Sequence, residues 1–265
     1  MISLQDALTN GRGTWRSFTC PSHDDRSPSA RVNAKTGKWV CMVCHAKGSI
    51  SNFRIDVDDQ LLMIKNALDH EERRTYQESW WDRFDSFRHP YWQSRFADEA
   101  IDLYRLGYDA DKDKPCYPLW SDDGMIIGPV YRNLDGLGPK YRYPFGANTS
   151  ELLFGIRELQ QSSTLVLVEG AMDVVAVREA GYDAVGSYGS VLYNSQVSLL
   201  QRIGAQRVLV AYDDDFAGRE GAVAAVRELS NAGILARQFS WDSHEKDLAE
   251  MAVDVRKNVL AKTLD

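Results

Sequence analysis

The sequence of 265 residues lacks any uncharged apolar run that approaches the ~20 residues of a membrane-spanning helix. Its first residues also lack the basic and then apolar pattern of a secretory signal peptide. Internal repeats and long tracts of biased composition are not visible. The composition is ordinary for a globular chain, with 44% hydrophobic and 26% charged residues. We therefore expect no membrane association and a cytoplasmic location.

Cysteine is scarce, and the four cysteines are unevenly placed. Cys20, Cys41 and Cys44 share a short segment with His23, whereas Cys116 stands apart. In a chain without a secretory signal, this grouping favours metal binding over disulfide bonds. The sequence also has no Gly-x-x-x-x-Gly-Lys-Ser/Thr loop, the ATP-binding motif of helicase motors.

The net charge of −7 conceals two parts of opposite sign. Residues 1–55 contain eight Lys or Arg and three acidic residues, a balance of +5. The remaining residues contain 23 basic and 35 acidic residues, a balance of −12. A basic small module can bind phosphate directly, while an acidic larger one needs bound cations to do so.

Two tight ligand pairs predict a structural zinc site near the N-terminus. They are Cys20-Pro-Ser-His23 and Cys41-Met-Val-Cys44, separated by 17 residues. A gap of two residues lets a tight turn direct both side chains at one ion, and three thiolates with one imidazole complete a tetrahedral zinc site. Short strands are predicted at residues 30–32 and 38–40, so we expect a zinc ribbon. A chance cluster of buried cysteines is the alternative.

The middle of the chain predicts a helical connection and then a small mixed domain. Helical spacing of apolar residues occurs over 55–68 and again from Tyr91 to about 110, where Phe96, Ala100 and Leu103 fall on one side. Strand-like pieces follow at 117–120, 125–132 and 140–143, separated by Asp-Gly turns. We expect a zinc-binding domain at 1–55, a helical linker at 56–84 and a larger domain at 85–265.

Basic residues and tyrosines alternate in these strand-like pieces, which is typical of a surface that binds phosphates and stacks on bases. An exposed sheet also carries some Lys and Arg without any such role. The candidate nucleic-acid or nucleotide-binding residues are Arg132, Lys140, Tyr141 and Arg142.

Residues 164–240 alternate strand and helix, which predicts a parallel sheet covered on both faces. Buried strands are expected at 164–168, 184–187 and 207–212 and a fourth strand at 234–240, with helices between them.

Acidic residues follow two of these strands directly. Glu169 comes after the first strand, and Asp213 to Asp215 come after the third. The carboxyl ends of parallel strands meet at one edge, and several carboxylates there need cations such as Mg²⁺ or Mn²⁺ between them. Alternation of side chains favours Asp213 and Asp215 as ligands, with Asp214 pointing away. The alternative is that these acids cap the following helix, and Asp173 likewise lies where an N-cap is expected.

The motifs together resemble bacterial and phage DNA primases. Cys20-Pro-Ser-His23 with Pro28-Ser29, and Trp39-Val-Cys41-Met-Val-Cys44 with Gly48, resemble the primase zinc-binding domain. Glu169-Gly-x-x-Asp173 and Asp213-x-Asp215-x-x-Gly218 resemble the catalytic TOPRIM domain, expected over about 162–250. Asp214 and Leu248 depart from the family pattern, which usually has glycine and proline there.

This resemblance implies a zinc ribbon followed by an α/β catalytic domain, in which a small mixed α+β subdomain precedes a Rossmann-like TOPRIM subdomain. It implies that the chain is a polymerase that makes short RNA primers on single-stranded DNA from ribonucleoside triphosphates during DNA replication. Asp247 is implied to complete the magnesium site, and Arg132 and Lys140 to guide template and nucleotide.

A separate replicative helicase is an expected partner, and a phage-encoded chain would act in the host cytoplasm. The rival interpretations are a TOPRIM nuclease and a non-catalytic recombination mediator that combines zinc and TOPRIM modules.

Overall fold

The computed structural model comprises two compact units, Met1–Arg73 and Arg74–Asp265. It describes residues 7, 14–23, 28–49, 75–85, 87–136, 139–144, 147–160, 163–241 and 246–264. The helix predicted over 55–68 lies outside these residues, as does most of the predicted linker. The predicted domain boundaries therefore stay predictions.

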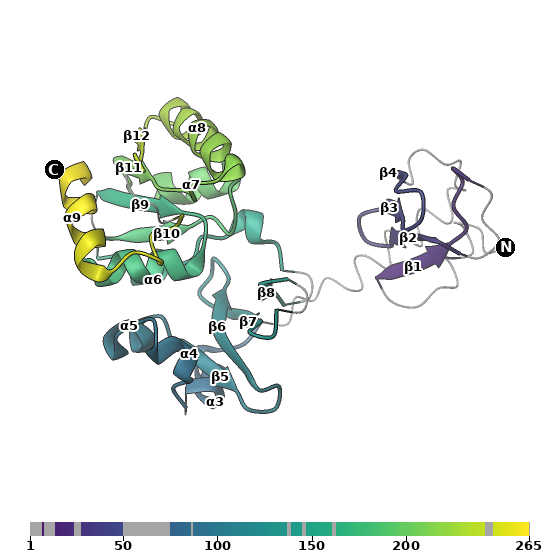
Figure 1. The fold of residues 1–265 in the computed structure, drawn as a ribbon, viewed down its shortest axis with the longest axis horizontal. Coiled ribbons are helices and arrows are strands. Elements are labelled where there is room, and N and C mark those ends of the chain that lie inside the picture. The colour runs from purple at the N-terminus through teal and green to yellow at the C-terminus, as the bar shows by residue number, and fades with distance from the viewer. Residues whose placement is uncertain are drawn as a thin grey trace. The chain divides into compact units, whose positions relative to one another are not determined.

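The first unit contains an antiparallel sheet in the order β1-β2-β3-β4 (Figure 1). Its strands are β1 (Trp15–Phe18), β2 (Ala30–Asn33), β3 (Lys38–Cys41) and β4 (Lys47–Ser49). Phe18, Ala30 and Cys41 lie side by side across three strands and are buried. This sheet confirms the predicted zinc ribbon and adds β1 and β4, which the sequence patterns did not predict.

The second unit begins with short helices and a second antiparallel sheet. The helical pieces are η2 (Glu78–Trp81), α3 (Asp82–Asp85), α4 (Pro90–Gln93) and α5 (Asp98–Leu103). The sheet has the order β5-β6-β7-β8, with strands β5 (Gly107–Asp109), β6 (Lys114–Trp120), β7 (Ile126–Arg132) and β8 (Tyr141–Arg142). This is the expected small α+β subdomain.

The helical rhythm from Tyr91 onward does not produce one continuous helix. The first helix, α4, ends at Gln93, and Ala97, which has extended backbone, is the N-cap of α5. The Ala97 N–H donates to Glu179 Oε1 at 2.6 Å, so a distant carboxylate replaces a helical carbonyl acceptor. Leu103, at the end of α5, does not join Phe96 and Ala100 in the core and is 40% exposed. Two 3₁₀ segments, η3 (Thr149–Glu151) and η4 (Ile156–Glu158), connect this subdomain to the next.

A parallel sheet forms the rest of the unit, with the order β10-β9-β11-β12 (Figure 1). Its strands are β9 (Thr164–Val168), β10 (Ala184–Gly186), β11 (Arg207–Val210) and β12 (Leu235–Gln238). The helices are α6 (Ala171–Glu179), α7 (Asn194–Arg202), α8 (Phe216–Asn231) and α9 (Val253–Leu264). The parallel sheet predicted from the alternating strands and helices is confirmed.

Alternate residues of β9 pack into two different cores. Val166 and Val168 pack with α6 and α9 and with residues of β6 and β7, so the two subdomains share one core. Leu165 and Leu167 pack with α7 and α8 on the other face of the sheet. Burial on both faces explains why this strand is an uninterrupted apolar run.

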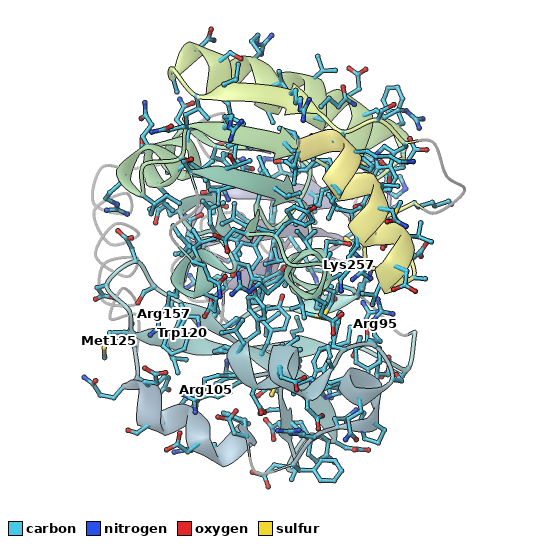
Figure 2. All side chains as sticks on the ribbon, turned by 90° about the vertical axis from the view of Figure 1, so that its left-hand side faces the viewer. Arg95, Arg105, Trp120, Met125, Arg157 and Lys257 are labelled. Atoms are coloured by element: carbon cyan, nitrogen blue, oxygen red, sulfur yellow. The ribbon has the colours of Figure 1, made fainter. Side chains whose placement is uncertain are left out.

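Two arginines tie the surface of the small subdomain together. The Arg157 guanidinium lies 3.6 Å from the centre of the Trp120 ring (Figure 2). Arg105 pairs with the carboxylates of Glu78, Asp82 and Asp85. None of the helices in the described part of the chain has the length and apolar composition of a membrane span.

Candidate metal centres and active site

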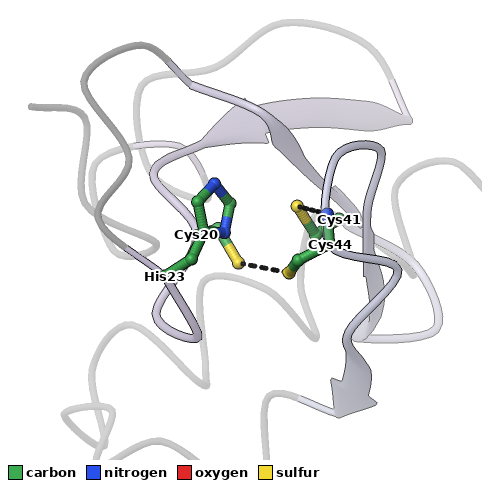
Figure 3. A group of neighbouring side chains, drawn as sticks. All are labelled: Cys20, His23, Cys41 and Cys44. Carbon is green, nitrogen blue, oxygen red and sulfur yellow. Dashed lines mark hydrogen bonds between the residues drawn. The ribbon is translucent and has the colours of Figure 1, made fainter.

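The structure brings the four predicted zinc ligands together at one end of the ribbon (Figure 3). Ligand atoms of Cys20, His23, Cys41 and Cys44 all lie within 4.8 Å of one another. The sulfurs of Cys20 and Cys44 are 3.6 Å apart. Tetrahedral zinc with Zn–S bonds of about 2.3 Å separates two sulfurs by about 3.8 Å, so these residues fit a closed structural zinc site.

Local hydrogen bonds prepare Cys41 to bind metal as a thiolate. Burial works against ionisation, but the Ser29 hydroxyl, 3.3 Å from the sulfur, and the backbone N–H groups of Cys44 and Val43 outweigh it. Together they lower the pKa of Cys41 to about 6. The thiolate is the form that binds zinc.

The two aromatic residues of the ribbon differ in exposure. Trp39 is buried and packs edge-on against Phe18, with ring centres 5.7 Å apart, so it is a core residue. Trp15 is 53% exposed. It lies on the face of the sheet opposite Phe18, which also carries Arg31, Lys38 and Lys47. None of the four strands contains an acidic residue. The exposed position of Trp15 was not predicted, because a single short strand shows no clear alternation of polar and apolar residues.

In the second unit, the predicted acidic residues gather at the carboxyl edge of the parallel sheet. Glu169 directly follows β9, and Asp213 comes three residues after β11. The Asp213 N–H donates to Glu169 Oε1 at 3.2 Å. The Asp214 N–H donates to the carbonyl of Lys246 at 2.7 Å, which brings the segment with Asp247 to the same edge.

The electrostatics of this edge show that its carboxylates interact. Burial, followed by the charge of Asp213, raises the pKa of Glu169 to about 7. Burial, followed by Asp247, raises the pKa of Asp213 to about 6, although Lys140 works in the opposite direction. Carboxylates at these positions are therefore costly to ionise together, which is the situation that a bound divalent cation relieves.

These acids are more widely spaced than the zinc ligands. Within the described ranges, the Cys/His group is the one set of three or more ligand side chains whose atoms all approach within 4.8 Å. Oxygen donors, partial burial and mutually raised pKa values nevertheless fit hard cations such as Mg²⁺ or Mn²⁺. No basic group forms an ion pair with Glu169, Asp213 or Asp215 within the described part of the chain.

Asp173 belongs to the same cluster, and its expected role as an N-cap is wrong. The N-cap of α6 is Gly170, while Asp173 lies buried in the first turn. Its Oδ1 accepts a hydrogen bond from the Ala249 N–H at 3.1 Å. Burial, followed by the charges of Asp247 and Asp213, raises the pKa of Asp173 to about 8. The sequence signal that could have placed Asp173 in this cluster is its spacing of four residues from Glu169.

Asp214 and Asp215 have different partners. Asp214 pairs with Arg219 at 2.8 Å, as expected for a side chain directed away from the cluster. Asp215 is the N-cap of α8, and its Oδ1 accepts from the Gly218 N–H at 2.8 Å. The capping alternative therefore holds for Asp215, but a cap uses one carboxylate oxygen and leaves the second for a cation.

Gly218 allows α8 to begin against the acidic cluster. A Cβ atom at this position would lie 2.1 Å from the carbonyl oxygen of Asp213 and 2.8 Å from Glu169 Oε1. Neither distance is compatible with a side chain, so the close approach requires glycine here.

The predicted basic residues lie in two kinds of environment. Arg132 lies between aromatic rings, 4.9 Å from the centre of Tyr141 and 5.6 Å from that of Tyr91. Its Nε and Nη1 are buried and meet no hydrogen-bond acceptor in the part of the chain that the structure describes. The Arg95 guanidinium lies 5.6 Å from the centre of the same Tyr91 ring. Lys140 and Arg142 are exposed.

Comparison with protein families identifies two domains in the chain. Residues 8–71 match the CHC2 zinc finger, and residues 166–252 match the Toprim-like domain. These ranges contain the Cys/His group and the acidic cluster respectively.

The chain is similar to individual DNA primases and to solved primase structures. A DNA primase of Deinococcus radiodurans is 24% identical over 300 residues, covering 88% of this chain and 52% of that protein. The chain thus spans about half the length of this relative. The zinc-binding and RNA polymerase domains of Aquifex aeolicus primase superpose with a TM-score of 0.58 at 20% identity, covering 95% of this chain and 78% of that one. A DnaG primase catalytic domain bound to ssDNA gives a TM-score of 0.55 at 22% identity, covering 65% and 70%.

The zinc site predicts a specific loss of metal. Elemental analysis of the purified protein should give about one zinc per chain, because the described residues contain one closed tetrahedral set. Cys41→Ser should lose most of this zinc, whereas Cys116→Ala, which removes a buried thiol outside the group, should keep it. Full zinc content in Cys41→Ser would contradict the assignment.

The acidic cluster predicts a stability profile that depends on pH and magnesium. Folding raises the pKa values of Glu169, Asp213 and Asp173 from 4.5, 3.8 and 3.8 to about 7, 6 and 8. The folded state thus binds these protons more tightly than the unfolded state does. The stabilisation that protonation gives to the folded state is lost as pH rises through about 6 to 8. Added Mg²⁺ should raise Tm more at about pH 8.5 than at about pH 5.5. Equal Tm shifts at the two pH values would contradict this account. Asp173→Asn, which removes one of the titrating carboxyls, should flatten the dependence of stability on pH.

Proposed function

Because this chain belongs to the family of DNA primases that combine a CHC2 zinc finger with a Toprim-like domain, we propose that it synthesises short RNA primers on single-stranded DNA. The reaction is nucleotidyl transfer during DNA replication, in which a 3′-hydroxyl attacks the α-phosphate of a ribonucleoside triphosphate and pyrophosphate leaves. The acidic cluster at the carboxyl edge of the parallel sheet is the observation that carries this proposal.

The proposed catalytic residues are the carboxylates that surround this edge. Glu169, Asp213 and Asp215, completed by Asp247, hold Mg²⁺ or Mn²⁺. When bound, these ions lower the pKa of the attacking hydroxyl and stabilise charge on the phosphate oxygens. Asp173 holds the segment after Asp247 in place through its hydrogen bond with the Ala249 N–H.

The basic residues beside the cluster supply the binding surface for phosphates. The positive charge of Lys140 acts to lower the pKa of both Asp173 and Asp213. Lys140 therefore lies close to the carboxylates of the proposed metal site. Arg132 offers two N–H donors that have no acceptor among the described residues. Phosphate oxygens are suitable acceptors for a guanidinium that stacked tyrosines hold in position. Tyr141 and Arg142 extend this surface along β8.

The zinc ribbon is proposed to contact the single-stranded template. Its open sheet face combines the exposed Trp15 ring with Arg31, Lys38 and Lys47. Basic side chains bind the backbone of a single strand, and an exposed ring stacks on its bases. The solved DnaG primase catalytic domain that is bound to ssDNA supports single-stranded DNA as a ligand of the second unit as well. We propose further that a separate replicative helicase is a partner and that the chain acts in the cytoplasm.

The metal site is tested by Asp215→Asn with Asp214→Asn as the matched control. Asparagine caps helices about as well as aspartate, so α8 should remain capped in the first variant while one ligand charge is lost. Primer synthesis with labelled ribonucleotides should fall at least about 100-fold in Asp215→Asn, because such sites contribute several kcal/mol of electrostatic stabilisation. Asp214→Asn should stay within about threefold of the wild type, because its partner is Arg219.

Two results would contradict these ligand assignments. One is an Asp215→Asn protein that makes primers at the normal rate. The other is a loss of activity that is matched by unfolding, which thermal denaturation of both variants detects. A loss of similar size in Asp214→Asn would mean that the loop conformation, and not the charge of Asp215, is required.

The phosphate-binding role of Lys140 predicts a change in salt dependence. A single phosphate contact contributes about one unit to the slope of log affinity against log salt concentration. Lys140→Ala should therefore bind single-stranded DNA or nucleotide more weakly at low salt and show a slope smaller by about one. Lys262→Ala, on the exposed face of α9, should leave the slope unchanged. Parallel slopes for wild type and Lys140→Ala would exclude a direct contact.

A further inference from the structure

Asp247 differs from the other proposed metal ligands in how the fold holds it. Glu169 directly follows β9, and Asp215 caps α8, so regular structure fixes both residues. Asp247 lies in the segment 246–251, which consists of bends and turns and belongs to no strand or helix. The position of its carboxylate therefore depends on the individual hydrogen bonds that hold this segment.

The buried side chain of Arg256 joins this segment to α6. Arg256 lies on α9, which packs against α6 (Figure 1), and it is 3% exposed. Its Nε donates to the Leu248 carbonyl and its Nη2 to the Met251 carbonyl, both at 2.7 Å. Its Nη1 donates to the carbonyl of Ala176 in α6 at 2.6 Å. One planar guanidinium thus connects the residue directly after Asp247 to a helix of the sheet.

The same guanidinium lies close to the acidic cluster. Burial lowers the pKa of Arg256, and the charge of Glu179 opposes this effect. The charges of Asp173 and Asp247 oppose it as well. Glu179 Oε2 lies 3.7 Å from Nη1, which is longer than a hydrogen bond. In the described part of the chain, the hydrogen bonds of Arg256 therefore all go to backbone carbonyls, and they fix the course of the backbone.

Other contacts hold the segment at points that Arg256 does not reach. The Lys246 carbonyl accepts the Asp214 N–H at 2.7 Å, and the Ala249 N–H donates to Asp173 Oδ1 at 3.1 Å. Arg256 binds the carbonyls on either side of Ala249. Asp173 and Ala176 are three residues apart, which is about one turn of α6. Both attachments therefore fix the segment to the same helix.

We propose that Arg256 is a positioning residue, which fixes the segment 246–251 to α6 so that Asp247 is in place before a cation binds. This inference rests on the proposed function and adds a residue that acts on the metal site through one of its ligands. Partners that orient a metal ligand commonly contribute about 10- to 100-fold to metal affinity. Lysine cannot replace Arg256 in this role, because an ammonium group is a point charge without the planar fork of donors.

Binding of Mn²⁺ to the zinc-loaded full chain tests the inference without nucleotide or template. The electron paramagnetic resonance signal of free Mn²⁺ measures the affinity. Arg256→Lys keeps the buried charge and loses the fork, so it should bind Mn²⁺ about 10- to 100-fold more weakly. Arg178→Lys in α6 is the matched control, because Arg178 pairs with the buried Asp183 at 2.8 Å. This control should stay within about twofold of the wild type, as expected for an independent site.

A double variant separates positioning from a general effect on stability. Asp247→Asn should itself weaken Mn²⁺ binding, because it removes a ligand charge. In the Asp247→Asn background, Arg256→Lys should change the affinity by less than about threefold, since its effect passes through Asp247. A residue that only stabilises the fold would cost the same affinity in both backgrounds.

Hydrogen–deuterium exchange of the wild type tests the same point without a variant that must fold. Peptides that cover residues 246–251 should be protected from exchange in the absence of Mn²⁺, because their hydrogen bonds form without the cation. Exchange as fast as in the unfolded chain would mean that the cation orders the segment and that Arg256 does not.

The proposal is overturned by such unprotected exchange or by wild-type Mn²⁺ affinity in Arg256→Lys. It is overturned equally by a similar loss in Arg178→Lys, by equal losses in the two backgrounds, or by an Asp247→Asn protein that binds Mn²⁺ normally. A chain that shows the expected Mn²⁺ binding but makes no primers would refute the polymerase and leave the positioning role intact. A chain that makes primers while Arg256→Lys binds Mn²⁺ normally would refute the positioning role alone.

Discussion

Repulsion among carboxylates at one edge of a parallel sheet constrains the second unit of this protein. Strands β9 and β11 are neighbours, so the residues that follow them are brought together whatever their charge. The raised pKa values of Glu169, Asp173 and Asp213 express this cost. The fold maintains the arrangement by three means: a shared core beneath the sheet, a glycine where α8 approaches Glu169, and a hydrogen bond from Ala249 to Asp173. A divalent cation bound between these carboxylates would relieve the repulsion and supply positive charge for phosphate.

The described residues of the first unit form only a small apolar core. Their buried cluster contains seven residues, two of which are the zinc ligands Cys20 and Cys41. A core of this size contributes little stability, and metal binding supplies folding free energy in such modules. Residues 1–55, which contain its sheet, carry a balance of +5, against −12 for the remainder of the chain. A basic sheet can attract phosphate directly, while an acidic edge needs cations to do so.

The sequence predicted structure best where a residue pattern arises from one local requirement, such as burial of a strand or binding of a metal. The apolar run of β9 predicted a buried strand because both faces are covered, and the cysteine pairs predicted the ribbon. Long-range contacts were not predictable in this way. The helix expected after Tyr91 is interrupted between Gln93 and Asp98, where Glu179, 82 positions away, accepts the N–H of Ala97. The place of Asp173 in the cluster depends likewise on burial against the distant segment around Ala249. The short strands β1 and β4 carry too few residues for a recognisable alternation.

The coupling between protons and cations at the acidic edge tests this account most directly. Titration calorimetry of Mn²⁺ into the zinc-loaded protein, repeated in buffers of different ionisation enthalpy, counts the protons that are released on binding. Glu169 and Asp173, with pKa values of about 7 and 8, are partly protonated near neutral pH. The account predicts net proton release at about pH 7 that disappears at about pH 9, where the carboxylates are already ionised. Binding without proton release at about pH 7, or no binding to the second unit, would contradict it.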